Sequence, residues 1–116
     1  MTKPVIPRPC ADTDIDEIFV YLWRHSPQAA RKFLDAVAFA FDLLGEQPSI
    51  GSSRHAGYFP DLPRPLRFHP LKEFERILIY YVDDADCVDV IRIWDAARGL
   101  EALLLEADIS SGNEPA

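Results

Sequence analysis

The sequence has little cysteine and no long apolar segment, and both absences narrow the class of protein. Cys10 and Cys87 are the only cysteines and form no CxxC motif, so we expect two free thiols in a reducing compartment. No apolar run is long enough to cross a bilayer. The first nine residues lack the apolar segment of a secretory signal. The sequence therefore predicts a cytoplasmic protein that does not contact a membrane.

Basic residues are also scarce relative to acidic ones. The chain has 12 lysines and arginines against 19 aspartates and glutamates, which gives a net charge of −7 and an isoelectric point near 4.8. Nonspecific binding to nucleic acid requires many cations that displace counterions from phosphates. We therefore expect no direct DNA binding.

Residue types that hold metals are present but poorly spaced. The acidic segment 83–89 lacks the glycine and the glutamate that a calcium loop needs at its sixth and twelfth positions. His25 and His55 have no partners at ligand spacing, so we expect both to lie on the surface. No metal and no cofactor are predicted.

What the chain does have is a pair of segments rich in β-branched and aromatic residues, 74–82 and 87–94. The short polar segment 83–86 between them predicts an antiparallel hairpin, and the extended segment 66–71 adds a third strand. Regular alternation along 88–95 places Val88, Val90, Arg92 and Trp94 on one face. Neither face of these strands is cleanly polar. Either both faces are buried within the domain, or a partner covers one of them.

Two helices are predicted before these strands. The first begins at Thr13, where Thr13-x-x-Asp16 resembles a capping box. The second begins after Ser26-Pro27, a good N-cap followed by a residue tolerated at the first helical position, and runs to about Gly45 or Glu46. Segment 5–6 is a weak strand candidate, and 100–107 is a candidate short helix.

Together these elements predict an α+β fold in the order β-α-α-β-β-β, with an N-terminal helical hairpin packed on a small antiparallel β-sheet. At 116 residues the chain is long enough for one domain with its own core. We expect that domain to span residues 1–107, and the polar segment 108–116 to be a disordered tail.

This order of elements resembles the ParE/RelE toxin superfamily of bacterial type II toxin–antitoxin systems. The resemblance spans most of the chain, although Ala97 and Gly99 replace the glycine and the aspartate that flank the arginine at the end of the last strand. The matching segments are Asp14–Leu22, Ala29–Phe33, Leu43–Arg54, Leu66–Phe68, Arg76–Val82 and Val90–Arg98.

The ParE-like branch implies a protein that inhibits DNA gyrase by binding and is neutralised by a ParD-like antitoxin in a hetero-oligomer. The resemblance then implies no catalytic residues. Arginine and tryptophan dominate interface energetics, so the predicted target contacts are Arg67, Trp94 and Arg98. The predicted antitoxin contacts are Phe19, Trp23, Phe33, Val37, Arg76 and Arg92.

The RelE-like branch is the alternative, and it implies a metal-independent, ribosome-dependent mRNA endoribonuclease. Its candidate catalytic residues are a cation cluster with a histidine: Arg67, His69, Arg76 and Arg98. The acidic net charge disfavours a ribosomal RNA target. A non-toxic binding module with the same fold stays open as a second alternative.

Overall fold

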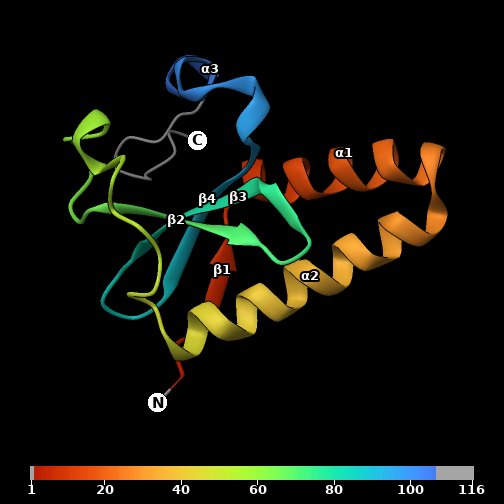
Figure 1. The fold of residues 1–116 in the computed structure, drawn as a ribbon. Helices are drawn as coiled ribbons and strands as arrows, with labels where there is room; N and C mark the ends of the chain where they lie inside the picture. Colours follow the sequence, from red (N-terminus) through yellow and green to blue (C-terminus); the bar gives the residue numbers. More distant parts are fainter. Residues whose placement is uncertain (1, 107–116) are drawn as a thin grey trace.

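The computed structural model describes residues 2–106 and has the predicted α+β architecture. Two N-terminal helices pack on one face of a four-stranded mixed sheet (Figure 1). The elements are β1 (Val5–Pro7), α1 (Pro9–His25), α2 (Pro27–Glu46), the 3-10 turn η1 (Ala56–Tyr58), β2 (Leu66–Leu71), β3 (Phe74–Asp83), β4 (Val88–Asp95), the 3-10 turn η2 (Ala96–Arg98) and α3 (Leu100–Glu106). The predicted tail, 108–116, lies outside the described residues.

The sheet has the strand order β1-β4-β3-β2. The antiparallel meander of β2, β3 and β4 confirms the prediction, and its observed bounds differ from the expected ones by one residue at most. The weak strand candidate near the N-terminus is also present: β1 runs parallel to β4, with Val5 opposite Val88. Because β1 has only three residues, it covers just the first part of the edge of β4.

The regular alternation predicted for β4 is wrong, because a bulge interrupts the pairing of β3 with β4. Tyr80 lies opposite Arg92 but Tyr81 lies opposite Val90, so Ile91 is the extra residue. An extra residue shifts every later side chain to the other face. Ile93 therefore packs in the core on the helical side, while Trp94 packs on the opposite face.

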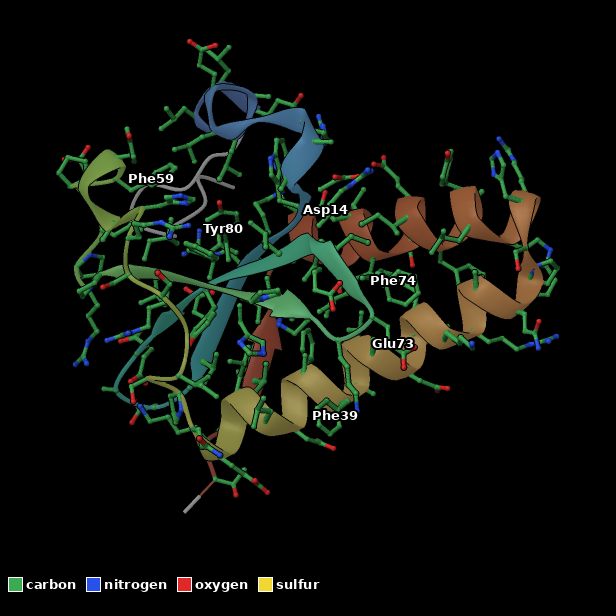
Figure 2. The ribbon with its side chains drawn as sticks, in the orientation of Figure 1. Asp14, Phe39, Phe59, Glu73, Phe74 and Tyr80 are labelled. Atoms are coloured by element: carbon green, nitrogen blue, oxygen red, sulfur yellow. The ribbon has the colours of Figure 1, made fainter. Side chains whose placement is uncertain are left out.

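Both faces of the sheet are covered by the chain itself, which settles the question of a partner on one face. The helical side holds one buried cluster that includes Phe33, and Phe74 packs against it from the sheet. On the other side, Phe59 and Leu103 cover a second cluster that contains Tyr80. Figure 2 shows Phe74 facing the helices and Phe59 with Tyr80 on the far face. Within residues 2–106 the chain thus covers most of both sheet faces, and the start of β3 stays open on the helical side.

The start predicted for the first helix is wrong, while the start of the second is confirmed. Helix α1 begins at Pro9, whose fixed backbone angle suits a first helical position, and no side chain caps this end. Thr13 therefore lies inside the helix and has no role as a cap. At the second helix, the Ser26 hydroxyl accepts a hydrogen bond from the Ala29 amide at 3.2 Å.

A buried ion pair fixes α1 against the sheet where β1 ends. The Asp14 carboxylate binds the Arg92 guanidinium through two hydrogen bonds of 2.7 and 2.8 Å, and it also accepts one from the Ile93 amide at 3.0 Å. The Ile93 amide lies on the edge of β4 beyond Val90, the last residue that pairs with β1. The Asp14 carboxylate thus gives this amide the hydrogen-bond acceptor that β1 is too short to supply. The same hydrogen bonding raises the pKa of Arg92. Figure 2 shows Asp14 at the start of α1, beside the sheet.

We expect Asp14→Ala to lower the free energy of unfolding by about 3–5 kcal/mol, because it leaves the Arg92 charge buried without its partner. Glu106→Ala is the control, since it breaks the half-exposed pair between Glu106 and Arg98 and should cost ~0–1 kcal/mol. Urea denaturation of both variants gives the comparison. Equal losses would contradict a structural role for the buried pair.

The loop after α2 is held by a tyrosine hydroxyl. The Tyr81 hydroxyl accepts a hydrogen bond from the Gly51 amide at 2.9 Å and donates one to the Pro48 carbonyl at 2.7 Å. A Cβ atom at Gly51 would lie only 2.5 Å from the Tyr81 oxygen and 2.9 Å from the Phe68 carbonyl oxygen. The close approach of backbone and ring therefore requires glycine at this position.

Gly51→Ala should lower the free energy of unfolding by about 1–3 kcal/mol, because the added methyl group forces the loop away from Tyr81. Gly57→Ala is the matched control, since a Cβ atom there meets nothing within 4 Å. Thermal unfolding followed by circular dichroism measures both. A Gly51→Ala variant as stable as Gly57→Ala would show that the loop does not depend on this contact.

Candidate functional site

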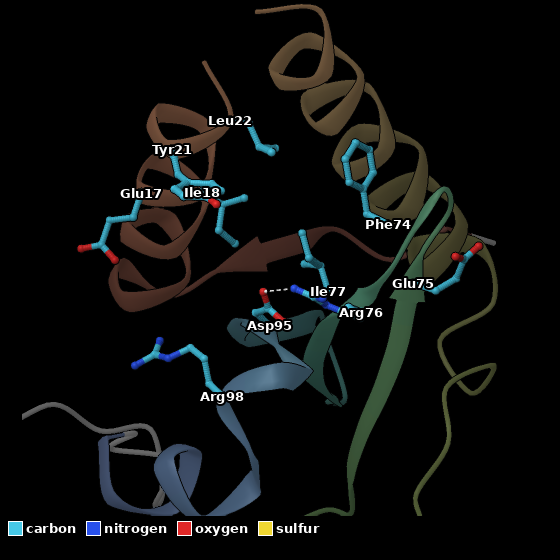
Figure 3. Close-up of a pocket in the computed structure, with 10 residues that line it drawn as sticks. All are labelled: Glu17, Ile18, Tyr21, Leu22, Phe74, Glu75, Arg76, Ile77, Asp95 and Arg98. Carbon is cyan, nitrogen blue, oxygen red and sulfur yellow. Dashed lines mark hydrogen bonds and ion pairs between the residues drawn. The ribbon is translucent and has the colours of Figure 1, made fainter. Parts of the chain in front are cut away.

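A largely apolar cleft of about 600 Å³ lies between α1 and the sheet. On this side of the molecule the helical hairpin extends beyond the start of β3 and the end of β4 (Figure 1). Figure 3 shows α1 on one side and β3 with η2 on the other. The cleft is lined by Glu17, Ile18, Tyr21, Leu22, Phe74, Glu75, Arg76, Ile77, Asp95 and Arg98.

Helical spacing produces the α1 wall of the cleft. Ile18 and Leu22 are four residues apart, so they lie on one face of the helix. Tyr21 stands beside them and is 61% exposed. Across the cleft, Phe74 and Ile77 form the apolar part of the β3 wall. These apolar side chains could accept one face of a helix or an extended peptide.

Two arginines stand at the sheet side of the cleft, and each already has an acidic partner. Arg76 donates a hydrogen bond of 3.3 Å to Asp95, which Figure 3 marks. Arg98 donates one of 2.6 Å to Glu106 of α3. The structure therefore brings together two residues that the sequence assigned to different roles, Arg76 to antitoxin binding and Arg98 to target binding.

Trp94 does not lie on the surface, contrary to its predicted placement as a target contact. It is 1% exposed, because the β4 bulge turns it into the core on the far face of the sheet. Its indole N–H donates to the Gly99 carbonyl at 3.2 Å, and the Arg98 guanidinium lies over its ring at 4.0 Å from the centroid. The position of Trp94 makes it a support for Arg98.

Three of the predicted antitoxin contacts are buried in the free chain, which contradicts their placement on the surface. Phe33 is 0% exposed and Val37 belongs to the same cluster, because both point from α2 into the core. Arg92 is held in its pair with Asp14. Each belongs to the interior that supports the helices.

The other predicted antitoxin contacts, Phe19, Trp23 and Arg76, are at least partly accessible. Phe19 and Trp23 stack with ring centroids 5.7 Å apart, and Arg31 lies over the Trp23 ring. Phe19 and Trp23 lie on a different side of α1 from the cleft. Of the three residues, Arg76 alone is part of the cleft lining.

The four residues of the ribonuclease hypothesis fall into two groups. Arg76 and Arg98 line the cleft, whereas Arg67 and His69 lie on β2 and do not. Arg67 lies opposite Tyr81, five residues along β3 from Arg76, which is a separation of roughly 16 Å along the strand. Its guanidinium donates to the Gly51 carbonyl at 2.8 Å. Burial lowers the pKa of His69, which favours its neutral form.

His55 was expected to lie on the surface without partners at ligand spacing, and it is half-buried. Its Nδ1 lies 3.0 Å from the Tyr80 hydroxyl, and its ring stacks on Phe68 with centroids 4.5 Å apart. Burial, together with the charge of Arg54, lowers the pKa of His55. These contacts hold the segment around η1 onto the far face of the sheet. They serve the fold and lie away from the cleft.

Several cleft residues had no functional role in the sequence-based predictions. Glu17 and Tyr21 lie one helical turn apart on α1, but helical spacing alone does not show that this face borders a cleft. Asp95, which pairs with Arg76, was also given no role. The one sequence pattern that could have indicated a cleft on this face of α1 is the apolar pair Ile18 and Leu22 beside Tyr21.

Within residues 2–106, no group of three or more histidine, cysteine or acidic side chains is arranged to hold a metal ion. Over the same residues, no helix is long and apolar enough to cross a membrane. The cleft has apolar walls and charged edges.

A search of curated proteins gives no match. The family model for the ParE toxin of the type II toxin–antitoxin system parDE matches residues 5–100. These residues include helices α1 and α2, the whole sheet and η2. The chain belongs to the ParE toxin family of type II toxin–antitoxin systems.

Proposed function

We propose that this chain is a toxin that inhibits DNA gyrase in the cytoplasm, and that its antitoxin neutralises it by binding the cleft between α1 and β3. Membership of the ParE family implies a cognate ParD antitoxin. The observation that carries the proposal is the open apolar cleft on a chain whose sheet faces are both covered.

The cleft suits an amphipathic helix or an extended segment of the antitoxin. Its apolar walls are formed by Ile18 and Leu22 on one side and by Phe74 and Ile77 on the other. The exposed Tyr21 adds a large ring at the edge of the cleft. Grooves of this kind take the apolar face of a helix at i, i+3, i+4 and i+7 spacing. Among the predicted antitoxin contacts, Arg76 fits this site, and Phe19 with Trp23 would extend it around α1.

Arg98 is the best candidate for the contact with gyrase. Its side chain is half-exposed and is held by the Trp94 ring, so little conformational freedom is lost on binding. Trp94 would act through Arg98. Arg67 stays a proposed target contact, on β2 and opposite Tyr81 of β3. Because Arg98 also lines the cleft, an antitoxin there would cover it.

Expression of the chain in a bacterial host tests the target. We expect growth arrest and loss of supercoiling by purified gyrase, and we expect Arg98→Ala to relieve both. Arg54→Ala is the control, because it removes an exposed arginine on the other side of the sheet. Arrest with intact supercoiling and cleaved mRNA would contradict the gyrase proposal and favour a ribonuclease. No arrest from soluble protein would indicate a non-toxic binding module.

Binding of the co-expressed cognate antitoxin tests the cleft. Tyr21→Ala should weaken the complex by about tenfold or more, because it removes the most exposed ring at the cleft. Tyr58→Ala is the matched control, since Tyr58 is 57% exposed but lies in η1, outside the cleft. Isothermal titration calorimetry gives both affinities. Equal affinities would place the antitoxin elsewhere on the chain.

A further inference from the structure

The charges around the cleft are unevenly balanced. Its lining holds three carboxylates, on Glu17, Glu75 and Asp95, against the guanidinium groups of Arg76 and Arg98. Asp95 is paired with Arg76, and Arg98 is paired with Glu106. Both cations are therefore already neutralised by acids of the same chain.

The two remaining carboxylates have no ion pair among residues 2–106. Glu17 is carried by α1 and Glu75 by β3, on opposite sides of the cleft. Both are exposed, and Figure 3 shows their carboxylates at the outer rim, directed away from the middle of the cleft. Asp16, next to Glu17, is also exposed and lines an adjoining groove that includes Arg24. Arg24 has no ion pair with any of these acids in the described part of the chain. The cleft thus has apolar walls and an unpaired carboxylate at the rim on each side.

This charge pattern constrains the occupant. An acidic segment placed between two unpaired carboxylates would meet like charges, which disfavour binding and select against that partner. A basic segment would gain pairs at the rim and would be drawn by the net charge of −7. Rim pairs add little affinity each, but they set the association rate and its salt dependence.

We propose that the antitoxin segment that fills this cleft is an amphipathic helix whose apolar stripe is flanked by lysine or arginine side chains that pair with Glu17 and Glu75. This inference rests on the proposed function, which places the antitoxin in the cleft. It adds the chemical class of the partner: a basic, apolar-striped segment binds, and an acidic segment of the same shape does not.

Two synthetic helical peptides of about 18 residues test the proposal, since that length gives five turns. They share leucines at i, i+3, i+4 and i+7 and differ only in flanking lysines or flanking glutamates. Fluorescence anisotropy with the whole chain at about 50 mM salt should show binding of the lysine peptide at least about tenfold tighter, and the difference should shrink at high salt. Equal affinities, tighter binding of the glutamate peptide or no binding of either would overturn the proposal.

Variants of the chain locate the effect. The double variant Glu17→Lys with Glu75→Lys should weaken binding of the lysine peptide by about threefold to tenfold. The matched control is Asp61→Lys with Asp86→Lys, which changes the net charge equally at exposed positions outside the cleft. If both double variants weaken binding equally, the attraction is general and the rim pairs are not formed.

The Tyr21→Ala variant separates this inference from the proposed function. If Tyr21→Ala weakens peptide binding and the Glu17 and Glu75 variant does not, the cleft is occupied but its partner is not selected by these charges. If neither change affects binding, the cleft is not the site, and the proposed placement of the antitoxin fails as well, while the gyrase proposal keeps its own test.

Discussion

The geometry of this protein depends on the buried pair between Asp14 and Arg92. β1 is too short to cover the edge of β4, so the Asp14 carboxylate takes the place of a strand partner at the Ile93 amide. The same carboxylate neutralises Arg92, which the fold buries to 9% exposure. One side chain thus anchors the start of α1 to the sheet. The rest of the helix, held at this end, extends past the sheet and forms one wall of the cleft.

The covering of both sheet faces is the reason why we propose the cleft as the place for a partner. Helices α1 and α2 bury one face, while α3 and the segment around η1 bury the other. The large apolar side chains that stay exposed include Tyr21, at the rim of the cleft. The helical hairpin extends beyond the sheet, and the proposed binding surface lies between α1 and the start of β3.

Local patterns in the sequence were enough to predict the elements, but contacts between distant residues were not. Ser26-Pro27 and the strand segment 66–71 are set by local chemistry, and the structure has them as expected. The bulge at Ile91 has no local signal, because it follows from how β4 pairs with β3. Since the bulge moves Trp94 into the core, a tryptophan predicted as a target contact instead lies beneath the guanidinium of Arg98. The cleft joins α1 to β3 and η2, which only the fold brings together.

The central claim is that the antitoxin occupies the cleft between α1 and β3. Hydrogen–deuterium exchange of the chain, free and bound to its cognate antitoxin, tests it most directly. The account predicts that new protection on binding is concentrated in segments 17–22, 74–77 and 95–98. Protection concentrated instead around η1 and β2, with segments 17–22 and 74–77 unchanged, would contradict it.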